Sequence, residues 1–442
     1  MFKKSFCSSP WFHIRINYNG GYNFCRWGKD TDFNFLKSNQ PNIANISIME
    51  YYNSNEMKKF RMDLLDGNCL DKCSVCHYEE KYNKLNGRIR QLAKSAIDLN
   101  NFELSFRSSP HYDMFNQSYT QQGHSDYYPT DLQIDLGNIC NSACIMCGPT
   151  ASSRLSADYK KLNKINSSLF ADPPVYKSWT QDSLLVDKFI NELSQIPNIR
   201  YIHFLGGETL YDEAFYLICE KLISAGLAKN IIVGTTTNGT IYDSRLERII
   251  KEFKEFHLGV SIETLSPLND YVRYPSQIDT VKLNLQKILQ LRDQTPGLFV
   301  SLRITPNLFT IYEIDNLIEF QLNNLVTAES CNILYEPEYL RMELLPANIR
   351  KEVLEKLEVL IKKHNFVKSH SVNTRRKDLI PLAIGDTAIE YYNFIKDYQV
   401  PNDADKLRYK LVDFLKAFES IRSNSIVDYA PRYEQFLRHY GY

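Results

Sequence analysis

The sequence predicts an α/β fold, built as a partial (βα)6 barrel with a cysteine-rich region before it and a helical extension after it. Strand-like and helical segments alternate from about residue 131, and eight of the ten cysteines fall into two groups that lie near the N-terminus and over 140–147. At 442 residues the chain is too long for one ordinary core. We therefore predict a cysteine-rich domain over 1–100, a linker over 101–130, a barrel over 131–340 and a helical region over 341–442.

Composition disfavours several classes of function. Lys+Arg and Asp+Glu both count 52, so the chain has no net charge to attract nucleic acid or anionic membranes, and nucleic acid is an unlikely partner. The sequence lacks an apolar run of membrane-spanning length, and its first residues lack the apolar core of a signal peptide. We expect a cytoplasmic protein, where clustered cysteines favour a metal site over disulfides.

The N-terminal region is rich in aromatic residues. The segments 11–18 and 22–27 predict a β-hairpin around Asn19-Gly20-Gly21, and a helix is expected over 79–96. Residues 101–129 are polar and carry turn signals, so they are expected to form a linker or surface loop.

The barrel prediction depends on the order of its elements. Strands are expected at 132–136, 199–205, 231–235, 258–262, 298–303 and 331–335, with helices at 213–224, 244–253, 281–291 and 314–321. Such alternation indicates parallel strands joined by crossover helices, and six units suit a partial barrel rather than a closed TIM barrel. Amphipathic helices at 350–363 and 405–422 follow.

Three cysteines come directly after the first predicted strand. Cys140, Cys144 and Cys147 have the spacing C-x3-C-x2-C. Three thiolates on one loop can ligate three irons of a cubane cluster, which leaves the fourth iron open. An open coordination site is typical of catalytic metal centres, and loops after barrel strands hold active sites. The alternative is a buried or zinc-binding loop.

This motif resembles the signature of radical S-adenosylmethionine (SAM) enzymes. The resemblance implies a 4Fe-4S cluster whose open iron binds SAM, and an electron donor such as flavodoxin or ferredoxin. Reductive cleavage of SAM would yield a 5′-deoxyadenosyl radical that abstracts hydrogen from a substrate. Met146 stands where the family usually has an aromatic residue, and its thioether can pack on adenine.

Further residues match the family in the same order. Gly206-Gly207-Glu208 ends the second strand and is similar to the Gly-Gly-Glu motif that binds the SAM amino group, with Thr209 in place of the usual proline. By the same resemblance, the ends of the next three strands supply candidate cofactor-binding residues, namely Asn238, Ser261, Glu263 and Arg303. A turn or a structural polar role is the alternative for these four.

The N-terminal cysteines resemble the SPASM and twitch domains, which hold auxiliary iron–sulfur clusters. Cys7, Gly20 and Cys25 match the opening of that pattern, and a C-x2-C pair follows. The favoured ligands are Cys7, Cys25, Cys73 and Cys76. Cys69 is the expected spare, although it could replace Cys7, and a zinc site built from the same residues remains open. The domain usually follows the barrel, whereas here it precedes it.

The resemblance implies an oxidoreductase-like radical SAM enzyme. Peptide modification is the favoured reaction class, in keeping with a neutral chain that has 29 tyrosines. A dehydrogenase or mutase acting on a sugar or nucleotide-derived small molecule is the second expectation. A non-catalytic metal-binding interaction protein is the third, and it would need neither an open iron nor the Gly-Gly-Glu motif. No residue can be assigned as catalytic from the sequence.

Overall fold

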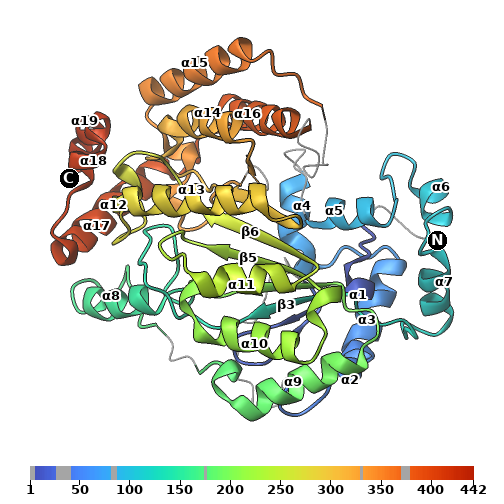
Figure 1. Cartoon of the computed structure of the whole chain (residues 1–442). Helices are drawn as coiled ribbons and strands as arrows, with labels where there is room; N and C mark the ends of the chain where they lie inside the picture. The colour runs from blue at the N-terminus through green and yellow to red at the C-terminus, as the bar shows by residue number, and fades with distance from the viewer. Residues whose placement is uncertain (1–4, 26–40, 81–86, 174–176, 329–331, 370–378) are drawn as a thin grey trace.

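The structure is a computed structural model of the chain, and it describes residues 5–25, 41–80, 87–173, 177–328, 332–369 and 379–442 (Figure 1). Within these residues one eight-stranded sheet has the order β2-β1-β3-β4-β5-β6-β7-β8. Its strands are β1 His13–Ile16, β2 Tyr22–Asn23, β3 Asp131–Asp135, β4 Tyr201–Leu205, β5 Ile232–Thr237, β6 Glu255–Ser261, β7 Leu298–Arg303 and β8 Thr327–Ala328. Every pairing is parallel except that of β1 with β2.

The two faces of the sheet differ in chemistry because side chains alternate along each strand. One face is apolar and fully buried, as Ile134, Phe204 and Val260 show. It lies under the crossover helices α9 Ser183–Gln195, α10 Glu213–Ser224, α11 Ser244–Glu252, α13 Ile278–Gln294 and α14 Ile314–Asn324, several of which are seen along the strands in Figure 1. The parallel barrel that the alternation predicts is therefore confirmed.

The N-terminal hairpin is also confirmed, although Trp11 and Phe12 belong to the short helix α1 Ser9–Phe12 and not to the first strand, and Arg26 and Trp27 of the expected second strand lie outside the described residues. Its turn holds Gly20 at a φ of +82°, a conformation that favours glycine. Strand β1 pairs in parallel with β3, so that Ile14 lies beside Leu132. The cysteine-rich region thus adds two strands to the barrel sheet.

The expectation of a loop over 101–129 is wrong. Helices α6 Phe102–Arg107 and α7 Tyr112–Thr120 form there. Phe106 and Phe115 stack on each other and pack edge-on against Phe6, in a small core that also includes Trp11. The apolar residues recur at helical spacing, and their burial outweighs the local turn signals.

Other N-terminal helices contribute to two cores, because Trp11, Leu65 and Leu92 belong to this small core and Tyr52 belongs to the main one. These helices are α1 Ser9–Phe12, α2 Ile48–Tyr52, α3 Asn55–Leu65, α4 Ser74–Glu80 and α5 Gly87–Lys94. The single helix expected over 79–96 corresponds to α5 and the end of α4, and residues 81–86 between them lie outside the described part.

The sixth predicted strand is wrong in position. Residues 332–335 form no strand, and Cys331 lies outside the described residues. Instead β8 follows at once after Leu325 ends α14 in a left-handed conformation. Ile333 and Leu334 are buried in a loop, which explains their apolar pattern.

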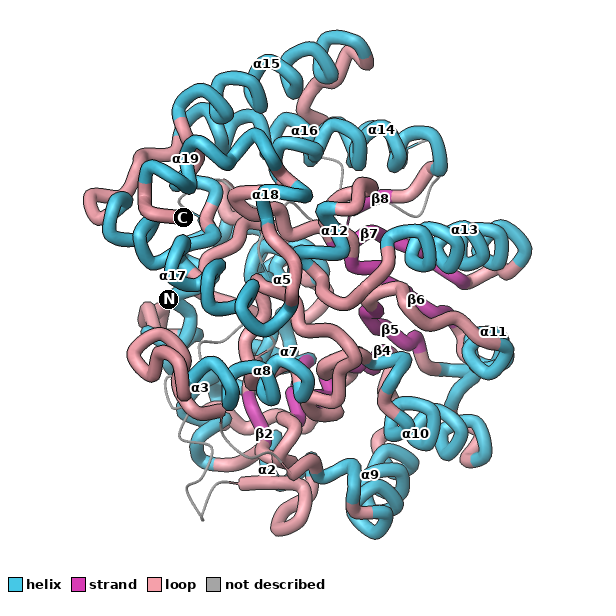
Figure 2. The backbone as a smooth tube through the Cα atoms, turned by 90° about the vertical axis from the view of Figure 1, so that its left-hand side faces the viewer, coloured by secondary structure: helices cyan, strands magenta, loops and turns pink. Residues whose placement is uncertain are grey.

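The C-terminal region is helical, as expected. It contains α15 Ala347–Lys363, α16 Ile380–Asp397, α17 Ala404–Arg422, α18 Ile426–Tyr429 and α19 Glu434–His439. Figure 2 shows α15 and α16 beside α14, while α17 lies nearer to α8 Ser153–Asn163. None of the described helices is long and apolar enough to cross a membrane.

Candidate functional site

The central cysteine loop leaves the end of β3 and is fixed along its backbone. Cys140 N donates to Ser153 Oγ at 3.2 Å. Farther on, Ala143 N donates to Tyr274 O at 2.6 Å and Ile145 N donates to Val272 O at 2.9 Å. The loop therefore runs beside the segment that follows α12 Leu268–Val272.

The three thiols of this loop are partly buried and influence one another. Burial, together with the neighbouring thiolates, raises the pKa of Cys140 to about 11 and that of Cys147 to about 12. Burial also raises the pKa of Cys144, against the opposing effect of Arg273. Burial and mutual repulsion disfavour three bare thiolates on this loop, and a bound cluster would supply the positive charge that stabilises them, so the donor set fits a metal cluster.

The Gly-Gly-Glu motif packs directly on the cysteine loop. Glu208 N donates to Ile139 O at 2.8 Å. A Cβ atom on Gly207 would lie 2.4 Å from the same oxygen, and one on Gly206 would lie 3.3 Å from Gly137 O. In this structure the glycines allow β4 to meet the backbone that leads to Cys140.

The side chains of Glu208 and Asn238 connect β5 to the same loop. The Glu208 carboxylate, 2% exposed, accepts from Thr237 Oγ1 at 2.6 Å and from Asn238 N at 2.5 Å. Burial raises the pKa of this carboxyl. Asn238 Nδ2 in turn donates to Asn141 Oδ1 at 2.7 Å and to Ser142 Oγ at 3.0 Å. Both residues hold the loop in position.

Glu263 forms a buried ion pair that the sequence did not reveal. Its carboxylate accepts from Arg273 Nη2 and, at 2.7 Å, from Thr305 N. Arg273 Nη1 lies 4.0 Å from Cys144 Sγ. Although burial alone would lower the pKa of Arg273, Glu263 and the Cys144 thiolate raise it above its ordinary value.

Arg422 is a second residue that sequence reasoning missed. It ends α17, is 8% exposed, and donates from Nη2 to Ala143 O at 2.8 Å and to Asp158 at 3.1 Å. The C-terminal region carries no chemical motif in the sequence, yet it supports the cysteine loop.

The remaining candidate cofactor contacts lie in two places. Met146 is half-buried within the cysteine loop. Ser261 and Arg303 are neighbours across β6 and β7, on the polar face of the sheet. Arg303 lies across Gly259, where a Cβ atom would be 2.6 Å from Arg303 Nε. These two residues occupy the strands rather than the loop itself.

The N-terminal cysteines surround one small cavity beside Arg88. Its cysteine lining consists of Cys7, Cys25, Cys73 and Cys76. Burial, together with nearby thiolates, raises the pKa of Cys73 to about 12 and raises that of Cys7 as well. Cys69 is exposed and does not line the cavity. In the described residues no three His, Cys, Asp or Glu side chains form a site for a single metal ion.

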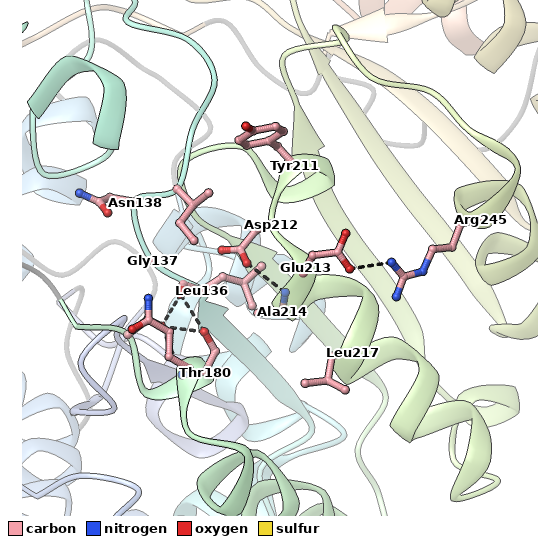
Figure 3. A pocket seen from close by; sticks show the side chains of 13 residues that line it. Leu136, Gly137, Asn138, Thr180, Tyr211, Asp212, Glu213, Ala214, Leu217 and Arg245 are labelled. Atoms are coloured by element: carbon pink, nitrogen blue, oxygen red, sulfur yellow. Dashed lines mark hydrogen bonds and ion pairs between the residues drawn. The ribbon is translucent and has the colours of Figure 1, made fainter. Parts of the chain in front are cut away.

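A cavity of about 730 Å³ opens beside the start of the cysteine loop (Figure 3). Its walls are residues 136–139, the segment 178–181, the start of α10 and Arg245. Arg245 pairs with Glu213 at 2.7 Å, while Asp212 caps α10 by accepting from Ala214 N at 3.0 Å. The backbone that leads to Cys140 therefore forms one wall of an accessible cavity.

Two family models match the chain. Residues 134–305 match the radical SAM superfamily, and residues 7–77 match an iron–sulfur cluster-binding domain, SPASM. These ranges contain the two cysteine sites, and they imply 4Fe-4S clusters and SAM as cofactors. The second matching domain is one that binds iron–sulfur clusters, which favours iron–sulfur over zinc at the N-terminal cysteines.

Solved structures share a distant likeness with the chain. The structure of anSMEcpe with bound AdoMet is 16% identical, covers 54% of this chain and 61% of its own, and has a TM-score of 0.38. SuiB of Streptococcus suis bound to S-adenosylmethionine is 14% identical, with 73% and 66% covered and a TM-score of 0.36. This chain therefore covers less than two thirds of the length of anSMEcpe and of SuiB. No curated protein sequence matches the chain.

Proposed function

Because the chain belongs to the radical SAM superfamily and carries a SPASM domain ahead of its barrel, we propose that it is an enzyme that cleaves SAM at the cysteine loop and abstracts hydrogen from a peptide. The observation that carries this proposal is that the thiols of Cys140, Cys144 and Cys147 lie close enough to influence one another, and that no fourth thiol acts on them among the described residues. The next cysteine, Cys219, is buried in the core on α10.

The residues around the loop have defined parts in this proposal. A bound 4Fe-4S cluster supplies the electron for SAM cleavage and one iron for SAM binding. Gly207, Glu208 and Asn238 keep the loop against β4 and β5. Met146 lies on the loop, and Ser261 and Arg303 lie on the polar face, so we assign these three to contacts with SAM.

The proposed auxiliary cluster is held by Cys7, Cys25, Cys73 and Cys76. Their placement around one cavity supports this ligand set, and the exposure of Cys69 supports its role as the spare. Such a cluster can bind a substrate or accept an electron from a substrate radical. A flavodoxin or ferredoxin is the proposed electron donor to the enzyme.

The polar face of the sheet supports a peptide substrate. Tyr201 Oη lies 3.0 Å from His203 Nδ1, and the His257 ring packs edge-on against Phe299 at 5.1 Å between ring centroids. These residues come from β4, β6 and β7, and the strand register places His203, His257 and Phe299 in one row across the sheet. A peptide offers regularly spaced backbone donors and acceptors to polar groups arranged in such a row.

The catalytic proposal is tested by anaerobic reconstitution with iron and sulfide, reduction by dithionite and addition of SAM. We expect 5′-deoxyadenosine from the wild type and none from Cys144→Ala. Cys219→Ala is the matched control, because it removes a thiol outside both cysteine sites, and it should retain cleavage. Absence of 5′-deoxyadenosine from a fully loaded, reduced wild-type protein would refute an enzymatic role.

The substrate class needs a separate measurement. Deuterated cell extract is divided into a peptide fraction and a small-molecule fraction, and each is incubated with the active enzyme. Deuterium in 5′-deoxyadenosine from the peptide fraction supports the proposal. Deuterium from the small-molecule fraction alone would contradict it and favour a dehydrogenase or mutase acting on a sugar or nucleotide-derived compound.

A further inference from the structure

A buried arginine faces one sulfur of the cysteine loop. We propose that Arg273 is a positioning residue that donates a hydrogen bond to the Cys144 sulfur and thereby raises the reduction potential of the cluster on this loop. This inference rests on the proposed function, because it requires that Cys144 ligates a cluster. It adds a determinant of how readily that cluster accepts an electron.

The register of two backbone segments places Arg273 opposite Cys144. Ala143 and Ile145, which flank the cysteine, donate to the carbonyls of Tyr274 and Val272, which flank the arginine. Two hydrogen bonds therefore fix this pairing on both sides. With the two residues opposite each other, Arg273 Nη1 lies 4.0 Å from Cys144 Sγ.

The arginine side chain is also fixed at its far end. It is 13% exposed and pairs with Glu263, whose own side chain is fully buried. Glu263 is held by Thr305 N through its carboxylate and by Asn269 Oδ1 through its backbone N–H at 3.1 Å. Because both partners are anchored, the guanidinium stays directed at the sulfur.

The expected effect on the cluster follows from charge. Reduction adds one negative charge, and an N–H donor to a ligand sulfur stabilises that extra charge. The interaction is strengthened where water is excluded, as it is around Arg273. Removal of the donor should therefore make the cluster harder to reduce.

Arg422 provides a matched control on the same loop. It is also buried and cationic, but it donates to the carbonyl of Ala143 instead of to a sulfur. Its loss should disturb the backbone of the loop without removing a sulfur contact. A comparison of Arg273→Met with Arg422→Met therefore separates the hydrogen bond from general support of the loop.

The test is a redox titration of the cluster, monitored by electron paramagnetic resonance. The signal that changes when SAM is added is followed, because it belongs to the cluster on the cysteine loop. At a fixed potential, we expect the ratio of reduced to oxidised cluster to fall at least tenfold in Arg273→Met, which is about 59 mV for one electron. Arg273→Lys should recover part of the shift, and it serves as the test variant if the methionine variant does not fold. Arg422→Met should change the ratio less than threefold.

A double variant separates the hydrogen bond from a simple change in charge. Glu263→Gln with Arg273→Met removes one negative and one positive group, and the shift should persist. A return to the wild-type ratio in the double variant, or equal shifts in the two arginine variants, would overturn the inference. An unchanged potential in Arg273→Met, while the wild type cleaves SAM, would also overturn it and leave the proposed function standing. If the wild-type loop loads no SAM-responsive cluster, it is the proposed function that fails.

Discussion

Replacement of Gly207 by alanine tests whether the cysteine loop depends on its contact with β4. The new Cβ atom would lie 2.4 Å from Ile139 O, 2.7 Å from Ile139 C and 2.8 Å from Asn138 C. All three are backbone atoms, so no flexible side chain can move aside. Gly207 is not among the glycines with positive φ, and the cost of the alanine is therefore steric rather than conformational.

The size of the effect follows from that geometry. The two backbone segments must separate by roughly 1 Å to restore normal contact. Overpacking of this kind costs about 1–3 kcal/mol. Separation also weakens the 2.8 Å hydrogen bond from Glu208 N to Ile139 O, which adds about 1 kcal/mol. A total of about 3 kcal/mol against the native loop should weaken SAM binding by roughly 100-fold.

The assay measures SAM affinity and 5′-deoxyadenosine formation, with iron content as a control for cluster loading. Gly148→Ala is the matched control, because its nearest neighbour would be the Thr150 hydroxyl at an ordinary 3.5 Å and it also lies beside a loop cysteine. We expect loss in Gly207→Ala and little change in Gly148→Ala. Wild-type SAM affinity in Gly207→Ala would refute the steric role of the motif.

Three further predictions address other parts of the molecule. Cys73→Ala should lower the iron content by one cluster while SAM cleavage without substrate continues, whereas Cys69→Ala should keep both clusters; equal iron in the two variants would contradict the ligand set. Because burial raises the pKa of Glu208, the folded state retains its proton more tightly, and the free energy of unfolding should fall as pH rises above about 4.3. When the free energy of unfolding is measured in urea at several values between pH 5 and 8, it should change less with pH in Glu208→Gln than in the wild type. An equal pH dependence in the two proteins would count against this effect. Arg15→Met should reduce the free energy of unfolding by about 1–3 kcal/mol in the same assay, because it leaves the buried Asp135 carboxylate without its 2.6 Å ion pair; no loss would contradict a stabilising role for this link between β1 and β3.

The sequence was informative where the chemistry is local. Cys140, Cys144 and Cys147 share one loop, so their spacing indicated a cluster site, and the resemblance to a family motif at the end of the second strand indicated Gly206-Gly207-Glu208. The structure then gave the glycines an additional reason, because Gly207 packs on the cysteine loop itself. Short motifs identify candidate site residues, but they do not show which packing contacts require each of those residues.

The residues that support the loop could not be predicted in the same way. Arg273 lies 129 residues from Cys144, and Arg422 lies 279 residues from Ala143. Arg273 belongs to no periodic pattern, and Arg422 only ends the amphipathic helix expected over 405–422, which gives no sign of a contact with the cysteine loop. Their roles arise from pairing between distant segments, which a single sequence does not specify.

Two differences in the fold have a similar origin. The hairpin was predictable from its turn, but the parallel pairing of β1 with β3 depends on a long-range register that the turn does not contain. Phe102 and Phe106 have helical spacing and Phe115 follows on the next helix, yet nearby serine, proline and glutamine residues favoured a loop. Burial of the three rings in one small core decided the outcome.

The central claim is that the cysteine loop holds a cluster with an open iron that binds SAM. It is tested most directly by electron–nuclear double resonance on the reduced protein with SAM labelled at the amino nitrogen. Cys73→Ala is the form to use, because only the cluster on the loop should remain. We predict a hyperfine coupling between the cluster and the labelled nitrogen. A fully loaded, reduced cluster that shows no coupling in the presence of saturating SAM would contradict the claim.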